Sequence, residues 1–167
     1  MKNVVLVIFL LISQFLFAQK SDLIQLRETC FKAFVENDPS EFLKRINQTN
    51  QINNPIFTAY KSIAILFEAK RAFSPVEKIR FFNTGKNLLE YSIYSDKLNL
   101  ELRFLRFCVQ TNLPFILGYS KNIKGDKEFI LKNWNFLADK DLKDRIKISM
   151  INSTYCNEIE KKKFSDG

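Results

Sequence analysis

The sequence predicts an all-α protein of about seven antiparallel helices, arranged as a helical bundle or as a short helical array. Apolar residues recur at steps of three and four along most of the chain, and this spacing buries one face of a helix. The 167 residues include four glycines and four prolines, so the pattern has few breaks. Alternation of the kind found in strands is brief and local. Short links between consecutive helices favour antiparallel neighbours.

Residues 1–18 predict a secretory signal peptide. Lys2 precedes an apolar run over residues 4–17, and Ala18 closes that run before a polar chain begins. The run is shorter than the roughly 20 apolar residues of a membrane-spanning helix. We therefore expect cleavage near Ala18, export to the periplasm or the medium, and a single all-helical domain over residues 19–167. An uncleaved membrane anchor is the alternative.

Three capping residues, each followed by a proline, mark helix starts: Asp38 with Pro39, Asn54 with Pro55, and Ser74 with Pro75. The capping side chain can accept a free backbone N–H, and a first-turn proline lacks an N–H that would have no partner anyway. Ser74 and Glu77 also have the spacing of a capping box. With the apolar periodicity, these starts predict helices at residues 21–36, 39–48, 55–72, 75–94, 99–111, 120–137 and 140–161.

Apolar stripes support these helices. In the first, third and fourth helices the stripes are Leu23, Leu26, Cys30, Ala33 and Phe34; Ile56, Tyr60, Ile63 and Phe67; and Val76, Ile79, Phe82, Leu89 and Ile93. Trp134 lies at helical spacing from Leu131 and Leu137, and we expect it in the core with most of the 17 Phe residues. Gly125 is a candidate break in the sixth helix.

The segment Thr111–Tyr119 (TNLPFILGY) is predicted to connect two helices. Pro114 and Gly118 interrupt the helical pattern there. Because residues 115–117 are all apolar, we expect this connection to pack against the protein rather than project into water.

Residues 85–99, GKNLLEYSIYSDKLN, resemble the second helix of a tetratricopeptide repeat. The small, large apolar and closing acidic positions of that family are occupied by Gly85 and Ser92, by Leu89 and by Asp96, while Lys97 stands where the family has proline. The helix starts also give one helix pair about every 36 residues, near the period of helical repeats. The resemblance implies a short array of paired helices.

The chain as a whole resembles small, uncharacterised exported proteins of Bacteroidota. The segments that carry this resemblance are, in order, GKNLLEYSI, ELRFLRF, LGYSKNI and DKEFI. The resemblance implies export and an all-helical fold, and it implies no particular activity.

The composition excludes several kinds of active site. Without His, the chain has no Ser-His-Asp or Cys-His nucleophile and no His-containing zinc site. It has neither a Gly-rich phosphate loop nor a CxxC pair, so we expect no cofactor and no metal. Cys30, Cys108 and Cys156 are predicted to be buried free thiols, and one disulfide is the alternative in an oxidising compartment.

The formal net charge of +8 is spread along the chain rather than gathered in a stripe. Nucleic acid is therefore not expected as a partner of an exported chain like this one. Contact with a membrane is expected only through an uncleaved signal peptide or through weak attraction to an anionic surface.

Residues 100–107 (LELRFLRF) contain the main candidate binding residues. Arg103 and Arg106 are three residues apart and share a helical face, and two guanidinium groups suit a carboxylate, a phosphate or an acidic peptide. In the alternative interpretation they pair with Glu90 or Glu101 and lay their stems on apolar surface. Four further candidates complete a polar patch: Lys86, Tyr91, Tyr119 and Lys121.

The favoured function is an exported binding or adaptor module for a protein or peptide partner, with an acidic partner as one possibility. The first alternative is a small-ligand or lipid carrier with a Phe-rich cavity. The second is a hydrolase without His, which would need two carboxylates of the central helices to converge in a cleft. Its candidates are Glu68, Glu77, Glu90 and Glu101. With no catalytic motif present, we expect no enzyme and assign no catalytic residue.

Overall fold

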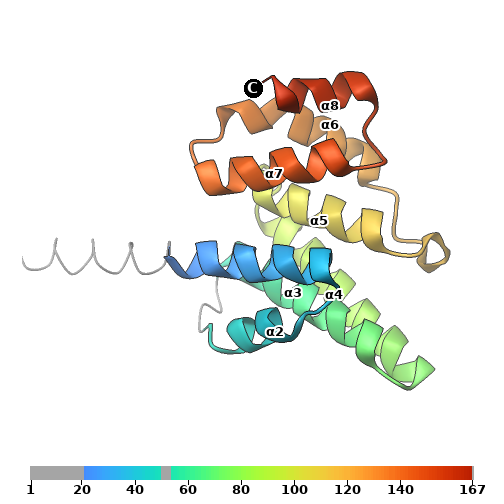
Figure 1. The fold of residues 1–167 in the computed structure, drawn as a ribbon. Coiled ribbons are helices and arrows are strands. Elements are labelled where there is room, and N and C mark those ends of the chain that lie inside the picture. The colour runs from blue at the N-terminus through green and yellow to red at the C-terminus, as the bar shows by residue number, and fades with distance from the viewer. Residues whose placement is uncertain (1–20, 50–53, 167) are drawn as a thin grey trace, which may run out of the picture.

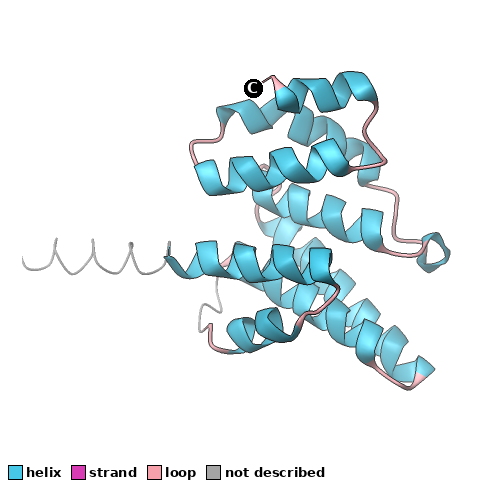
Figure 2. Ribbon diagram, in the orientation of Figure 1, coloured by secondary structure: helices cyan, strands magenta, loops and turns pink. Residues whose placement is uncertain are grey.

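The computed structural model describes residues 21–49 and 54–166 (Figure 1). Every regular element in these ranges is helical and none is a strand (Figure 2), which confirms the predicted all-α class. In the same ranges, no helix combines the length and the apolar character needed to cross a membrane. The predicted signal peptide and its cleavage site lie outside the described residues.

Eight α-helices and two short 3₁₀ helices make up the described part of the chain. The first covers residues 21–36, and it is followed by α2 (Ser40–Asn47), α3 (Pro55–Arg71), α4 (Pro75–Ser95), α5 (Leu100–Asn112), the 3₁₀ helix η1 (Phe115–Leu117), α6 (Ile123–Asn133), the 3₁₀ helix η2 (Trp134–Phe136), α7 (Lys140–Asn152) and α8 (Glu158–Ser165). From the end of the first helix to η2, the predicted helix boundaries agree with these to within about three residues.

The single helix predicted over residues 140–161 is wrong, because this stretch forms two helices, α7 and α8. Asn157 and Glu160 form a capping box at the start of α8. The Asn157 side chain accepts from the Glu160 backbone N–H, and the Glu160 carboxylate accepts from the Asn157 N–H, both at 2.9 Å. The box starts a new helix inside a periodic stretch. Gly125, in contrast, lies within α6 and does not interrupt it.

One of the three predicted helix starts has a side-chain cap hydrogen bond: Asn54 Oδ1 accepts from a first-turn N–H of α3 at 2.9 Å. The cap predicted at Asp38 is wrong by one residue, because Pro39 is the N-cap of α2 and has no side-chain cap hydrogen bond. Asp38 Oδ1, one residue earlier, accepts from the Ser40 N–H at 3.0 Å. The capping box predicted for Ser74 and Glu77 is wrong, because the Ser74 side chain makes no cap hydrogen bond. The Glu77 carboxylate instead lies 3.8 Å from the Arg80 guanidinium, one turn further along α4.

Two hydrophobic cores lie on either side of α5. The first combines the 21–36 helix, α2, α3, α4 and one face of α5, and its most buried side chains include Leu26, Phe42, Ala59, Leu89 and Leu102. The second combines the other face of α5 with α6, η2, α7 and α8, and it includes Ile130, Ile146, Met150 and Phe164. Trp134, predicted as a core residue, is 1 % exposed and packs against Phe164 with ring centroids 4.7 Å apart.

Helices α3 and α4 pack side by side at very close range (Figure 1). Gly85 makes this approach possible, since a Cβ at that position would lie 2.8 Å from the Leu66 side chain and 2.9 Å from the Ser62 carbonyl. Leu89 and Ser92, on the same face of α4, are also buried. The small positions of the tetratricopeptide-like segment therefore face α3, while its membership of that family stays a prediction.

A buried ion cluster ties the first helix to α5 and α7. Arg27 donates to Glu101 of α5 through Nε and Nη2, both at 2.7 Å. Its Nη1 donates to Asp139 at 2.8 Å and to Asp141 at 3.3 Å, at the start of α7. The Tyr60 hydroxyl of α3 donates to Glu101 at 2.8 Å. Because α7 belongs to the second core, this cluster holds the two halves of the protein together.

Candidate functional site

Arg106, one of the two predicted contact arginines, is buried in a second ion cluster. Its Nε and Nη2 donate to Asp126 of α6 at 2.7 and 2.8 Å, and its Nη1 donates to Glu90 of α4 at 2.7 Å. Burial opposes the charged form of this side chain, but the bonds to Asp126 and the attraction of Glu90 outweigh it and raise the pKa of Arg106. The guanidinium group is therefore held charged by internal carboxylates.

Arg103 lies at the edge of this cluster and binds the same Asp126 carboxylate as Arg106. It is 25 % exposed, and its Nη1 donates to Asp126 at 2.8 Å while its Nε donates to the Lys97 carbonyl at 3.1 Å. The guanidinium also lies 5.1 Å from the centre of the Phe129 ring. Two of its five N–H donors are thus taken up within the protein.

The cluster corresponds in part to the alternative interpretation of the two arginines. Glu90 does bind Arg106, whereas Glu101 binds Arg27 instead. Because the cluster joins α4, α5 and α6, it supports the fold. A role for Arg103 and Arg106 in partner binding stays a prediction.

The other four predicted residues are divided between this cluster and the surface. Tyr119 is buried, its hydroxyl donates to Glu90 at 2.6 Å, and burial together with that carboxylate raises the pKa of Tyr119. The Lys86 ammonium lies 5.6 Å from the centre of the Tyr119 ring. Tyr91 and Lys121 are exposed and take no part in these contacts. The six predicted residues therefore do not form one open patch.

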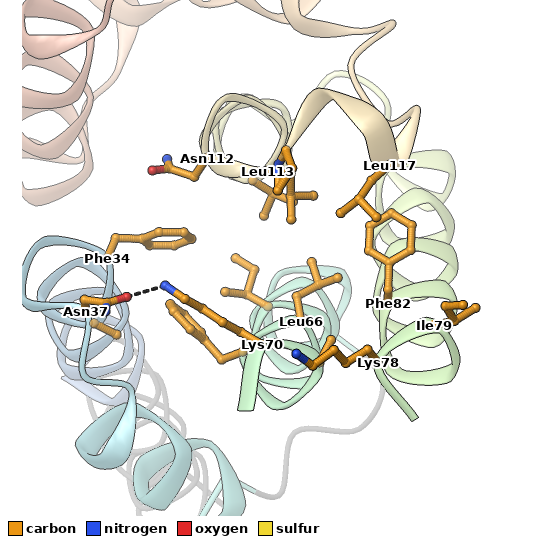
Figure 3. A pocket seen from close by; sticks show the side chains of 16 residues that line it. Phe34, Asn37, Leu66, Lys70, Lys78, Ile79, Phe82, Asn112, Leu113 and Leu117 are labelled. Carbon is orange, nitrogen blue, oxygen red and sulfur yellow. Dashed lines mark hydrogen bonds between the residues drawn. The ribbon is translucent and has the colours of Figure 1, made fainter. Parts of the chain in front are cut away.

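An apolar groove, which the sequence did not reveal, lies at one end of the first core (Figure 3). It has a volume of about 560 Å³ and is built from the ends of the 21–36 helix, α3 and α5, the beginning of α4, and η1 with the residues before it. Twelve of its sixteen lining residues are apolar: Ala33, Phe34, Ile63, Leu66, Phe67, Ala69, Ile79, Phe82, Val109, Leu113, Pro114 and Leu117. The polar four are Asn37, Lys70, Lys78 and Asn112.

Two lips of exposed apolar side chains adjoin the groove. The first lies at the turn from α3 to α4, where Phe73 is fully exposed and is followed by exposed Val76 and Ile79. The second is η1, where Phe115 is exposed and Ile116 is 92 % exposed. Single exposed apolar residues are ordinary, whereas here two groups of them lie beside one apolar groove.

The second lip contradicts the prediction that residues 115–117 pack against the protein. Leu117 does line the groove, but Phe115 and Ile116 project into water. A 3₁₀ turn has three residues per turn, so only one of its three side chains can point inward. Gly118, in the left-handed region at φ 63°, then reverses the chain directly after that turn.

The polar residues of the groove place positive charge at its mouth. Lys70 donates to the side-chain oxygen of Asn37, as Figure 3 shows. Lys78 makes no ion pair with any carboxylate in the described ranges. The groove therefore offers an apolar surface edged by amines.

The four carboxylates proposed for a hydrolase do not converge. Glu68 and Glu77 lie beside Arg71 and Arg80 on the surface, whereas Glu90 and Glu101 belong to separate ion clusters. In residues 21–49 and 54–166, no group of three or more acidic or cysteine side chains is arranged to hold a metal ion. The groove itself is lined by no carboxylate and no cysteine.

The three cysteines are free, as predicted. Cys30 and Cys156 are buried and Cys108 is partly buried. Burial of the thiol raises the pKa of Cys108 to about 12, and burial also raises the pKa values of Cys30 and Cys156. Since the thiolate is the reactive form, these thiols are poor nucleophiles.

This predicts slow alkylation of Cys108 in the folded protein. At pH 8 a thiol with a pKa of about 12 is ionised in about one molecule in 10,000, so its reaction with iodoacetamide is expected to be at least about 1,000-fold slower than in urea. Mass spectrometry of the folded and urea-unfolded chains would measure both rates. Comparable rates in the two states would show that the thiol is not buried in solution.

No family model, no curated protein and no solved structure matches this chain. The resemblances to tetratricopeptide repeats and to exported proteins of Bacteroidota stay predictions.

Proposed function

We propose that this protein is an exported binding module that takes the apolar face of a protein or peptide partner into the groove. The observation that carries the proposal is the combination of an apolar groove with two exposed apolar lips. Burying apolar surface drives most protein association. A partner that covered the groove and the lips would therefore gain binding free energy from both.

A macromolecular partner accounts for more of this surface than a small ligand does. A ligand seated in the groove would cover the lining residues and leave Phe73 and Ile116 in water. A partner segment that lies across the mouth covers the lining and both lips together. The groove is open to solvent rather than enclosed, which favours an adaptor over a carrier.

Export is the second part of the proposal and it is supported by the sequence of residues 1–18. A basic residue, a short apolar run and a small residue occur there in the order of a signal peptide. An exported partner is therefore the one to look for.

Site-specific photo-crosslinking tests the proposed function. A photoreactive phenylalanine analogue replaces Ile79 or Ile116 on the lips, and in matched controls it replaces exposed Ile148 or Ile159 in the other half of the protein. In extracts of the source organism, we expect a defined protein adduct from the two lip positions and none from the controls. The adduct should disappear when Ala69→Trp fills the groove, but not when Val35→Trp adds the same side chain outside it.

Two results would contradict the proposal. Equal adducts from lip and control positions would show that the lips have no special affinity. Adducts of only a few hundred daltons at the lips would favour the carrier.

A further inference from the structure

We propose that the partner segment is an acidic amphipathic helix. The inference rests on the proposed function above, and it adds the chemistry of the segment that the groove binds. Apolar side chains of the segment would enter the groove, and flanking carboxylates would meet Lys70, Lys78 and Lys86.

The first argument is the spacing of charge along α4. Lys78, Phe82 and Lys86 follow one another at four-residue steps and therefore share one helical face. Phe82 lines the groove, and the Lys86 ammonium lies 6.0 Å from the centre of its ring. An apolar contact surface is thus bracketed by two amines on one face.

The second argument is that these amines have no acidic partner. Lys78 and Lys86 make no ion pair within the described ranges, and Lys70 bonds the neutral amide of Asn37. The neighbouring carboxylates lie beside arginines instead: Glu68 beside Arg71 at 3.4 Å and Glu77 beside Arg80 at 3.8 Å. The groove lining holds Lys70 and Lys78 and no carboxylate, so its charge is positive, which attracts an acidic segment and repels a basic one.

The third argument concerns the backbone of the segment. An extended peptide would need partners for its N–H and C=O groups. The groove lining is mostly apolar side chains, and the described residues contain no strand whose edge could pair with it. A helix satisfies its own backbone and presents apolar anchors at three- and four-residue steps, so it fits this surface better.

Two labelled peptides test the inference. Both have about 18 residues, or five helical turns, and the same Leu/Ala apolar face, but the polar face is Glu in one and Lys in the other. Fluorescence anisotropy with the full chain at low salt should give about tenfold tighter binding of the Glu peptide, because each surface ion pair adds a few-fold. The difference should shrink as salt is added. Ala69→Trp should abolish binding of the Glu peptide.

Two double charge reversals, one at the groove and one elsewhere, test whether the groove lysines cause the preference for the Glu peptide. Lys78→Glu with Lys86→Glu should remove the preference for the Glu peptide. Lys124→Glu with Lys132→Glu makes the same change in net charge at the same eight-residue spacing on α6, at exposed positions outside the groove. This control pair should keep the preference.

The outcomes separate the two proposals. If both peptides bind equally and Ala69→Trp blocks both, the groove binds helices without regard to charge, and only the acidic character is overturned. If neither peptide binds while lip-specific protein adducts persist, the partner is not an acidic helix. If neither binds and phosphatidylglycerol vesicles bind in an Ala69→Trp-sensitive manner, the surface is a membrane site, and the inference and the proposed function both fail.

Discussion

Replacing Asp126 with alanine is expected to lower the free energy of unfolding by about 3 to 5 kcal/mol. Asp126 is 0 % exposed, and it accepts two hydrogen bonds from Arg106 and one from Arg103. Without it, the buried guanidinium of Arg106 would keep only Glu90 as a charged partner. The loss is large because a buried charge that loses its partner is not compensated by water.

Urea denaturation followed by the fluorescence of Trp134, the single Trp of the chain, would measure this effect. The matched control is Asp144→Ala, which removes an exposed ion pair with Lys140 and is expected to leave stability nearly unchanged. If the two variants lost similar amounts, the Arg106 cluster would not be supporting the fold.

A double replacement separates the charge from the packing. Arg106→Met with Asp126→Leu removes both charges and keeps apolar volume in their place. Buried ion pairs are often replaced by apolar residues at little cost, so this variant should be more stable than Asp126→Ala alone. A double variant less stable than Asp126→Ala would mean that the loss of Arg106 as the partner of Glu90 costs more than the unpaired Arg106 charge in Asp126→Ala.

Replacing Gly85 with alanine is expected to destabilise the protein by about 1 to 3 kcal/mol, the usual cost of overpacking. Alanine forms helices better than glycine by about 1 kcal/mol, so helix propensity alone predicts the opposite sign. The new Cβ would lie 2.8 Å from the Leu66 side chain and 2.9 Å from the Ser62 carbonyl. The Leu66 side chain can rotate away, but a backbone carbonyl moves only with α3 itself.

Gly125→Ala is the matched control, because it makes the same change in α6, where nothing lies within 4 Å of the new methyl group. It is expected to be neutral or stabilising by up to about 1 kcal/mol. Urea denaturation measures the change in the free energy of unfolding of each variant. A decrease for Gly85→Ala together with no change or an increase for Gly125→Ala would confirm that the close approach of α3 and α4 causes the destabilisation. A neutral Gly85→Ala would show that α3 moves at little cost.

The Gly85 variant also bears on the groove. Leu66 lines the groove, so a displacement of α3 that relieves the new contact would reshape the groove. Weaker binding of the Glu peptide to Gly85→Ala than to Gly125→Ala is expected for that reason.

Much of the helical structure followed from local patterns. The proline start at Asn54, the apolar stripe of α3 and the core position of Trp134 depend on residues a few positions apart, and these predictions are confirmed. The break between α7 and α8 was missed, although its signal was present: Asn157 and Glu160 have capping-box spacing inside an otherwise periodic stretch. The prediction followed the apolar periodicity and did not use the capping box.

The pairing of charges could not be predicted in the same way. Arg106 meets Asp126 twenty residues away, and Arg27 meets Glu101 seventy-four residues away. Sequence spacing indicates which residues share a helical face, but it does not indicate which helices become neighbours. A guanidinium on an apolar helix is therefore compatible both with a binding contact and with an internal ion pair.

The sequence by itself determined the all-α class, most of the helix boundaries and the absence of His-based chemistry, because these depend on composition and on residues within a turn or two. Only the tertiary structure decided where the groove and its two lips lie. The groove is assembled from segments between Ala33 and Leu117, and the two lips are separated in sequence by most of α4 and all of α5. Apolar residues such as Phe115 look alike in a core and on a lip. Burial, which depends on how the helices pack, is what distinguishes them.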